Sequence, residues 1–288
     1  MTPDLETLVV AAYFFADQLR APRGRGRPPK VSDEELVALA VAQAVMGVCS
    51  DPHFLGLVAR VLPGWFPHLP DQSQYNRRLR ALTPRIVWVQ QQLSALLATG
   101  TLRLADGTLV GVANYAGCAE RSEFAGVAAY GYCPSKSRFY WGVRLVLLTD
   151  PLGLPVGYTL VAANEKEYEP VRELTTGEQG ATLITDKGLW GREYAETLRL
   201  QGIVIRTPER QRTPENAHSE RRLARMRLVV ESTIANLKCQ MRLEQHLAKT
   251  PSGLVQRIAQ RLLALTLGML LNALTGRPPR NLVAYDGR

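Results

Sequence analysis

Three carboxylates stand where the strand and helix patterns of the sequence would let them share one site. Asp106 lies at the start of a β-rich stretch, and Asp186 closes a short apolar strand. Glu231 lies inside a long basic helical pattern, next to Val230 and close to Ile234. A carboxylate near an apolar helix face is costly unless it is paired or bound to metal. We therefore take Asp106, Asp186 and Glu231 as candidate catalytic and metal-binding residues.

Carboxylate oxygens on separate elements suit hard divalent cations, and Mg²⁺ in particular prefers oxygen ligands. Two such ions, roughly 3.5–4 Å apart, can stabilise the attacking and leaving oxygens of a phosphodiester. Arg227 and Lys238 lie four residues before and seven residues after Glu231, so all three share one helical face. We expect two Mg²⁺ ions, for which Mn²⁺ can substitute. We expect the side chains of Arg227 and Lys238 to hold DNA phosphates.

Each carboxylate also has a plainer interpretation. Asp106-Gly107 fits an ordinary turn, Asp186-Lys187-Gly188 fits a turn that ends a strand, and Glu231 could pair with Arg227 on a surface helix. The joint pattern, with three acids in this order on these element types, favours the metal site.

The elements that must position these residues fall into two groups. The first hundred residues predict helices over 5–19, 32–48, 51–61, 73–82 and 85–97. Ser32 and Glu35 form a capping box at the second of these. The Arg/Gly-rich stretch 22–30 contains Pro and Gly and cannot be helical.

From residue 101 the pattern changes to strands. Strands are expected at 108–113, 140–148, 154–161, 181–185 and 203–205, and helices at 168–174, 192–200, 220–247 and 252–274. A three-stranded meander followed by alternating helix and strand is the order of the ribonuclease-H-like fold, a mixed α/β sheet with flanking helices. We expect an all-helical DNA-binding domain at 1–100 and this catalytic domain, with C-terminal helices, at 101–288.

The charge of the chain points to a polyanionic partner. The 288 residues carry a net charge of +9, and residues 201–288 alone hold 15 basic and 6 acidic side chains. An excess concentrated in one region suggests a binding face for nucleic acid, although an ordinary solvated basic helix would give the same count.

Several classes of protein are excluded or disfavoured. The four cysteines show no Cys-x-x-Cys spacing, which excludes a zinc ribbon and disfavours a disulfide scaffold. The apolar run 262–274 is shorter than the roughly 20 residues of a membrane span. We therefore expect a soluble, cytoplasmic protein without a membrane partner.

Further cations are candidates for DNA contact. Arg25 and Arg27 form an AT-hook-like core that would enter a minor groove, unless this stretch is only a flexible linker. A helix that could enter a major groove carries Tyr75, Arg77, Arg78 and Arg80, although it could equally be a solvated surface. The basic helix adds Arg222, Arg225, Arg227 and Lys238.

With these residues in view, the sequence resembles the DDE-type transposases of bacterial insertion sequences, and most closely the insertion-sequence family numbered nine-eighty-two. The stretches 128–136, 150–164 and 186–188 carry the resemblance. Related transposases have Tyr, Arg, Glu and Lys at steps of three, four and seven on their last helix, and this chain has Ala224, Arg227, Glu231 and Lys238.

The resemblance implies a specific activity. Asp106, Asp186 and Glu231 would take the metal-ligand places, and Lys136 and Lys187, within the matching stretches, are expected to contact DNA. The implied partners are double-stranded DNA, both transposon terminal inverted repeats and target, and a second copy when two ends are bridged. The chain departs from the family at Ala224 and in lacking prolines after Asp106.

Three functions compete at this point. The first is a transposase that cleaves DNA and transfers the strand in two metal-dependent steps. The second is a transposase-derived DNA-binding regulator without catalysis, which has no need of metal. The third is a stand-alone nuclease on the same fold, which would form no strand-transfer product.

Overall fold

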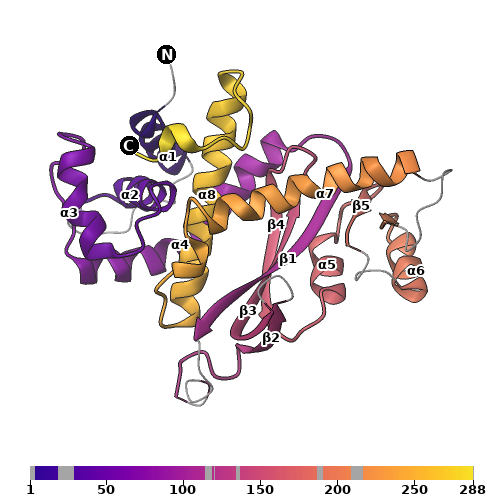
Figure 1. Ribbon diagram of the computed structural model, residues 1–288. Coiled ribbons are helices and arrows are strands. Elements are labelled where there is room, and N and C mark those ends of the chain that lie inside the picture. Colours follow the sequence, from indigo (N-terminus) through magenta and orange to yellow (C-terminus); the bar gives the residue numbers. More distant parts are fainter. Residues whose placement is uncertain are drawn as a thin grey trace. The chain divides into compact units, whose positions relative to one another are not determined.

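A computed structural model describes residues 4–18, 29–113, 119, 121–133, 137–186, 191–208 and 217–287. The chain divides into two compact units (Figure 1). Residues 1–96 and 235–288 form the helical unit, and residues 97–234 form the sheet unit.

This division differs from the two consecutive domains expected from the sequence. The boundary near residue 100 has a counterpart at Leu97, but the C-terminal segment 235–288 belongs with the N-terminal helices. The physical reason is packing, because the C-terminal helix α8 (Pro251–Leu274) contacts both α1 (Leu5–Gln18) and α2 (Asp33–Val45). The helical unit is therefore assembled from the two ends of the chain.

The sheet unit holds the mixed sheet. Its strands are β1 (Leu102–Ala113), β2 (Ala129–Cys133), β3 (Arg138–Thr149), β4 (Pro155–Ala162), β5 (Thr182–Ile184) and β6 (Val204–Arg206). β3 pairs antiparallel with β1, β2 and β4, whereas β5 pairs parallel with β1 and β6. The order β4-β3-β1-β5-β6 is that of the ribonuclease-H-like fold, as the sequence predicted, with β2 as an added hairpin strand that the sequence did not predict.

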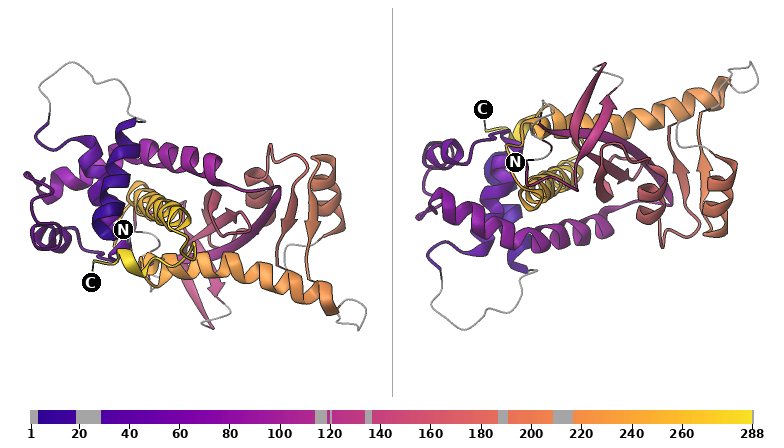
Figure 2. Two further views of the ribbon diagram at one scale, coloured as in Figure 1. Left: turned by 90° about the horizontal axis from the view of Figure 1, so that it is seen from above. Right: turned by 90° about the horizontal axis from the view of Figure 1, so that it is seen from below.

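Helices flank this sheet. The helices α5 (Tyr168–Leu174) and α6 (Arg192–Leu200) lie where the sequence predicted them, and their Val171 and Leu198 pack with Ala105, Val146 and Leu183 in one buried cluster. The long orange helix in Figure 2 is α7 (Ala217–Lys238). It ends nine residues before the predicted end at 247, and a short 3-10 helix follows at Leu243–Gln245 after Arg242, whose φ is +49°.

In the helical unit, the predicted capping box is confirmed: Ser32 accepts from the backbone N–H of Glu35, and the Glu35 carboxylate accepts from that of Ser32. α3 spans Asp51–Val61. The two helices expected at 73–82 and 85–97 form one helix, α4 (Gln72–Leu97), with Pro84 inside it. Pro84 removes one backbone hydrogen bond, but Leu79, Ile86 and Val89 are buried on either side, and that burial keeps the helix continuous.

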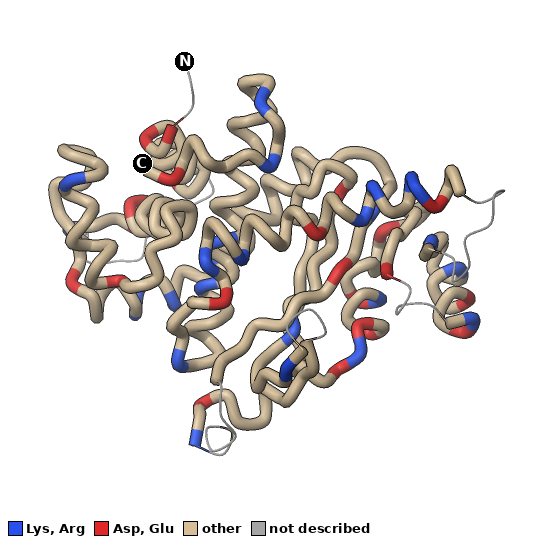
Figure 3. The backbone as a smooth tube through the Cα atoms, in the orientation of Figure 1, with Lys and Arg blue, Asp and Glu red and all other residues tan. Residues whose placement is uncertain are grey.

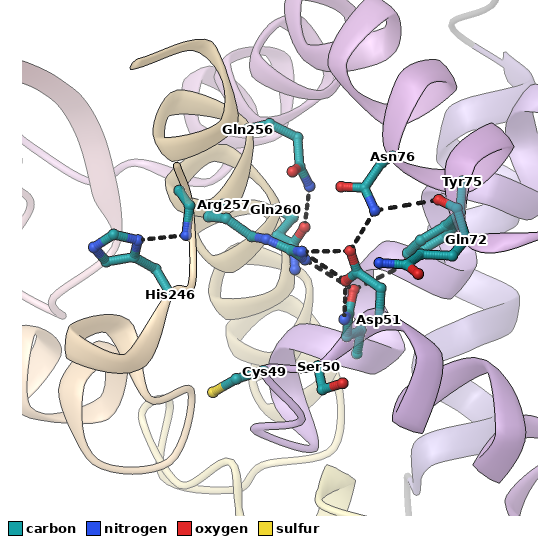
Figure 4. Close-up of polar contacts among 12 residues, drawn as sticks. Cys49, Ser50, Asp51, Gln72, Tyr75, Asn76, His246, Gln256, Arg257 and Gln260 are labelled. Carbon is teal, nitrogen blue, oxygen red and sulfur yellow. Dashed lines mark hydrogen bonds and ion pairs between the residues drawn. The ribbon is translucent and has the colours of Figure 1, made fainter. Parts of the chain in front are cut away.

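A hydrogen-bond network around one buried ion pair links four helices of this unit, α2, α3, α4 and α8 (Figure 4). Arg257 of α8 donates to both carboxylate oxygens of Asp51 of α3, at 2.6 and 2.7 Å. Gln43 and Asn76 donate to the same carboxylate, and Tyr75 of α4 donates its hydroxyl to Gln43. This network satisfies Asp51, which is only 5% exposed.

α8 is the one helix within the described part of the chain that is long and apolar enough to cross a membrane. In the structure 83% of its apolar stretch is buried. Its Arg257 and Arg261 are buried too, and Arg261 donates to the carbonyl oxygens of Met241 and Arg257. This burial is typical of a helix in a protein core.

Replacing one partner of the buried pair should destabilise the helical unit. Arg257→Met leaves the Asp51 carboxylate buried without its countercharge, and we expect the free energy of unfolding to fall by about 3–5 kcal/mol. Urea denaturation of the full chain followed by circular dichroism measures it. The double variant Asp51→Asn/Arg257→Met, which leaves neither member of the pair charged, should recover part of the loss. If it is as unstable as the single variant, the ion pair is not the cause.

Candidate active site

Asp106 lies within β1, four residues after the strand begins rather than at its start. Its neighbour Ala105 packs against the helices α5 and α6, and side chains alternate along a strand. Asp106 and its cross-strand partner Leu147 therefore face the other side of the sheet. Its Oδ1 accepts a 2.9 Å hydrogen bond from the backbone N–H of Gly107.

Asp186 reaches the same level of the sheet through the parallel pairing of β1 with β5. The last pair in that register is Leu104 with Ile184. Asp106 and Asp186 are each two residues beyond this pair, and β5 has ended, so both carboxylates lie where the two strands separate. Parallel strands bring such residues together at one edge of a sheet.

Glu231 is supplied by α7. Val230 and Ile234, both buried, fix the side of the helix that faces the protein, and the Thr233 hydroxyl donates to the Gly153 carbonyl oxygen at 2.9 Å. With these contacts α7 is held along the sheet unit, and the half-exposed Glu231 carboxylate is free to point toward the strand ends.

Arg227 joins two of the three acids. Its guanidinium lies 3.3 Å from Asp186 Oδ1 and 3.4 Å from Glu231 Oε1. Both carboxylates are therefore within reach of a single cation, although one comes from the end of β5 and the other from α7. The predicted pairing of Glu231 with Arg227 is present, and Asp186 shares it.

Asp106 belongs to the same electrostatic cluster. Its pKa is raised to about 6, first by burial and then by the negative charge of Glu167. Glu231 raises the pKa further, whereas the Gly107 N–H and Arg227 lower it. The effect of burial and of the neighbouring negative charges on the pKa of Asp106 is therefore larger than the opposing effect of Arg227.

Glu167 is a carboxylate near Asp106 that the sequence pattern did not predict as a site residue. It directly precedes α5, and it forms an ion pair with Arg144 of β3. In the sequence it lies in the charged run 165–169, which is typical of a solvated turn. The sequence around residue 167 therefore gives no sign of a role in the site, because the contact that brings Glu167 there is with Gly107, which is distant in sequence.

The donor set of the site fits a divalent metal ion in chemistry. Asp106, Asp186 and Glu231 offer only carboxylate oxygens, the ligands that Mg²⁺ prefers, and their mutual repulsion is relieved by a bound cation. Among the described residues no group of three or more His, Cys, Asp or Glu is already arranged to hold a metal. In this structure the cation between Asp186 and Glu231 is the Arg227 guanidinium.

Comparison with known proteins decides the family. The sequence model of the family described as "Transposase DDE domain" matches residues 98–267, more than half of the chain. The chain belongs to this family. The family is one of DNA-cleaving and DNA-transferring enzymes, and all three candidate carboxylates fall inside the matched region. No curated protein sequence matches the chain.

Solved structures of transposases are similar to this DDE transposase domain at a distance. A piggyBac transposase synaptic complex with hairpin DNA is 10% identical, over 96% of this chain and 75% of that one, with a TM-score of 0.44. A Mos1 transposase paired-end complex with left transposon end is 12% identical, over 75% and 82%, with a TM-score of 0.26. A pre-cleavage Mos1 transpososome is 15% identical, over 88% and 82%, with a TM-score of 0.24. These scores are too low for individual positions to be compared.

The predicted DNA contacts are placed very differently by the structure. Arg25, Arg27, Lys136 and Lys187 lie outside the described residues. On α7, Arg222 and Arg225 are exposed. The basic character of α7 is visible in Figure 3 as blue segments along the helix. Lys238, at its end, pairs with Glu244 at 3.2 Å.

The α4 candidates differ among themselves. Tyr75 is completely buried and cannot reach a DNA groove, which corrects its inclusion among the groove-facing residues. Arg78 donates to the Val31 carbonyl oxygen and pairs with Asp33, so its guanidinium is engaged in contacts within the helical unit. Arg77 and Arg80 are exposed and stay candidates for DNA contact.

Arg80 also lines a pocket within the helical unit. This pocket of about 480 Å³ lies beside the Asp51–Arg257 pair, and Lys249 provides a second exposed cation at its wall. Polar groups at the first turns of α3, α4 and α8 complete the wall: Ser50, Gln72 and Thr250. Because Arg257 neutralises Asp51, the net charge of the lining is positive.

The raised pKa of Asp106 predicts a stability change with a defined pH dependence. The folded state favours the protonated acid, so ionisation costs stability as the pH rises from the ordinary pKa of 3.8 to about 6. Asp106→Asn should therefore stabilise the protein by about 1–3 kcal/mol at pH 7.5, and the gain should vanish near pH 4. Urea denaturation at the two pH values measures this difference.

Asp150→Asn is the matched comparison. Asp150 is fully buried, and its carboxylate accepts from the backbone N–H groups of Leu152, Leu154 and Thr99. The same change of carboxylate to amide should here destabilise by about 1–3 kcal/mol, because a buried acceptor is lost. Equal effects at the two positions would contradict the assignment of repulsion to Asp106 alone.

Proposed function

We propose that this protein is a transposase that binds transposon-end DNA and catalyses metal-dependent strand cleavage and strand transfer. Asp106, Asp186 and Glu231 are the carboxylates that would hold two Mg²⁺ ions, or Mn²⁺ in their place. The observation that carries the proposal is that Arg227 pairs with both Asp186 and Glu231, while Asp106 lies near enough for the charges of Glu231 and Arg227 to act on its pKa. The three acids are far apart in sequence and lie within the family-matched region.

The divalent ions, when bound, would activate a water or 3′-hydroxyl and stabilise the leaving oxyanion of the phosphodiester. Asp106 is held within a rigid strand and oriented by the Gly107 N–H, so little reorganisation is needed at its position. Arg227 keeps Asp186 and Glu231 together before the ions bind. Once released from these carboxylates, its guanidinium would be able to hold a DNA phosphate in a bidentate manner.

DNA is the partner that the positive surfaces favour. Arg222 and Arg225 extend from the helix that carries Glu231, so they would place the DNA backbone next to the acids. Arg80 and Lys249 would hold a backbone phosphate in the helical unit. Bridging two transposon ends needs two active sites, and we propose a homodimer as the working form, acting on the nucleoid in the bacterial cytoplasm.

A regulator without catalysis is the second candidate, and the position of Arg227 is the observation that favours it. A cation that is part of the chain already compensates Asp186 and Glu231, as a protein without metal would need. Mn²⁺ binding separates the two candidates, because a regulator gains nothing from metal. A stand-alone nuclease would cleave the same DNA but yield no strand-transfer product.

Removing a single acid should abolish cleavage while DNA binding persists. We expect Asp186→Asn and Glu231→Gln to lower the rate of cleavage of a terminal-repeat duplex, taken from the DNA flanking the gene, by roughly 10³-fold. Binding of the same duplex, measured by fluorescence anisotropy, should stay within about twofold. Glu196→Gln is the control, since Glu196 is an exposed acid on α6 that pairs only locally with Arg199. A parallel fall in binding and cleavage would show that these acids do not act in the chemical step.

The pocket cations should contribute to DNA affinity. Arg80→Ala and Lys249→Ala should each weaken binding of any duplex and lower the salt dependence of the affinity by about one ion. Arg60→Ala removes the same charge from an exposed position of the helical unit that does not line the pocket. If Arg60→Ala weakens binding as much as Arg80→Ala does, net charge rather than the pocket accounts for the effect.

A further inference from the structure

A glycine next to Asp106 leaves room for a second acid. An added Cβ on Gly107 would collide with Glu167 Oε1 and would lie 2.6 Å from its Cδ. Real Cβ atoms do not approach other atoms so closely, so any other residue at 107 would force the Glu167 carboxylate away. The Glu167 carboxylate therefore rests against the backbone of β1, beside the peptide whose N–H donates to Asp106.

Arg144 holds the Glu167 carboxylate in this place. The Arg144 guanidinium pairs with Glu167 and also donates to the Ala163 carbonyl oxygen at 3.2 Å, so it spans the turn between β4 and α5. Both side chains are mostly buried, at 22% and 17% exposed. A pair of this kind is geometrically fixed, because neither partner can leave without exposing the other to an unfavourable environment.

The carboxylate of Glu167 is not used as a helix cap. Glu167 occupies the N-cap position of α5, but its side chain makes no capping hydrogen bond there. An acid whose role was to start the helix would accept from the first free N–H groups. Here the carboxylate is turned toward Arg144 and Gly107 instead, and its charge is felt at Asp106 more strongly than that of Glu231.

We propose that Glu167, held by Arg144 against Gly107, is a positioning residue of the active site that raises the affinity of the Asp106 end for the divalent cation. Glu167 and Asp106 lie on opposite faces of β1, so Glu167 acts through Asp106 and need not bind the ion itself. The added negative charge makes cation binding more favourable and leaves the ligand set unchanged. This inference rests on the proposed function.

Mn²⁺ binding to the full chain without DNA, followed by electron paramagnetic resonance, tests the inference. Glu167→Gln should weaken Mn²⁺ affinity about tenfold. Glu169→Gln should leave the affinity unchanged, because Glu169 is two residues away and pairs with the more exposed Arg172. Thermal unfolding of each variant shows whether the fold is retained.

Gly107→Ala tests the same contact from the other side and leaves Arg144 and Glu167 in place. The new methyl group should displace the carboxylate and weaken Mn²⁺ affinity to a similar extent. In the Glu167→Gln background the glycine change should have little further effect, because the charge it would displace is already gone. Additive losses would overturn the inference.

Asp106→Asn separates this inference from the proposed function. If Asp106→Asn abolishes Mn²⁺ binding and Glu167→Gln binds as the unchanged protein does, Glu167 is only a structural partner of Arg144 and the inference is wrong. If the unchanged protein binds no Mn²⁺, or Asp106→Asn does not alter binding, the metal site itself is wrong and both proposals fall.

Discussion

The concentration of negative charge beyond the last β1–β5 pair is the constraint on which the sheet unit depends. Asp106, Asp186 and Glu231 lie there and Glu167 lies on the opposite face of β1, and burial and repulsion raise the pKa of Asp106 to about 6. A fold would not keep such a cluster for stability alone, because each ionised acid opposes the others. Arg227 and Arg144 offset part of the repulsion, and the remainder is available to a cation from outside.

The sequence predicted those parts of this site that depend on residues close together in the chain. Asp186 follows a short apolar strand, Glu231 sits beside buried positions of a helix, and α5 and α6 lie where the periodicity placed them. The order of strands was enough to predict the ribonuclease-H-like sheet. Each of these features depends on a few neighbouring residues, whose preferences agree with the fold.

What the sequence did not predict depends on contacts between distant residues. Glu167 is held beside the site by its contacts with Gly107 and Arg144. Nothing in the run 165–169 distinguishes it from its acidic neighbours. Pro84 looked like a helix boundary, but burial of Leu79 and Ile86 outweighed its local preference. The placement of 235–288 with the N-terminal helices likewise came from packing of α8, which no local pattern reveals.

The interleaved chain order has a consequence for synthesis. A ribosome delivers the carboxylate-bearing residues 97–234 before α8, the helix against which α1 and α2 pack. Domains fold as they emerge, so the sheet can assemble while the helical unit still lacks its core helix. A nascent or truncated polypeptide that stops before α8 thus carries the acids without a finished helical unit.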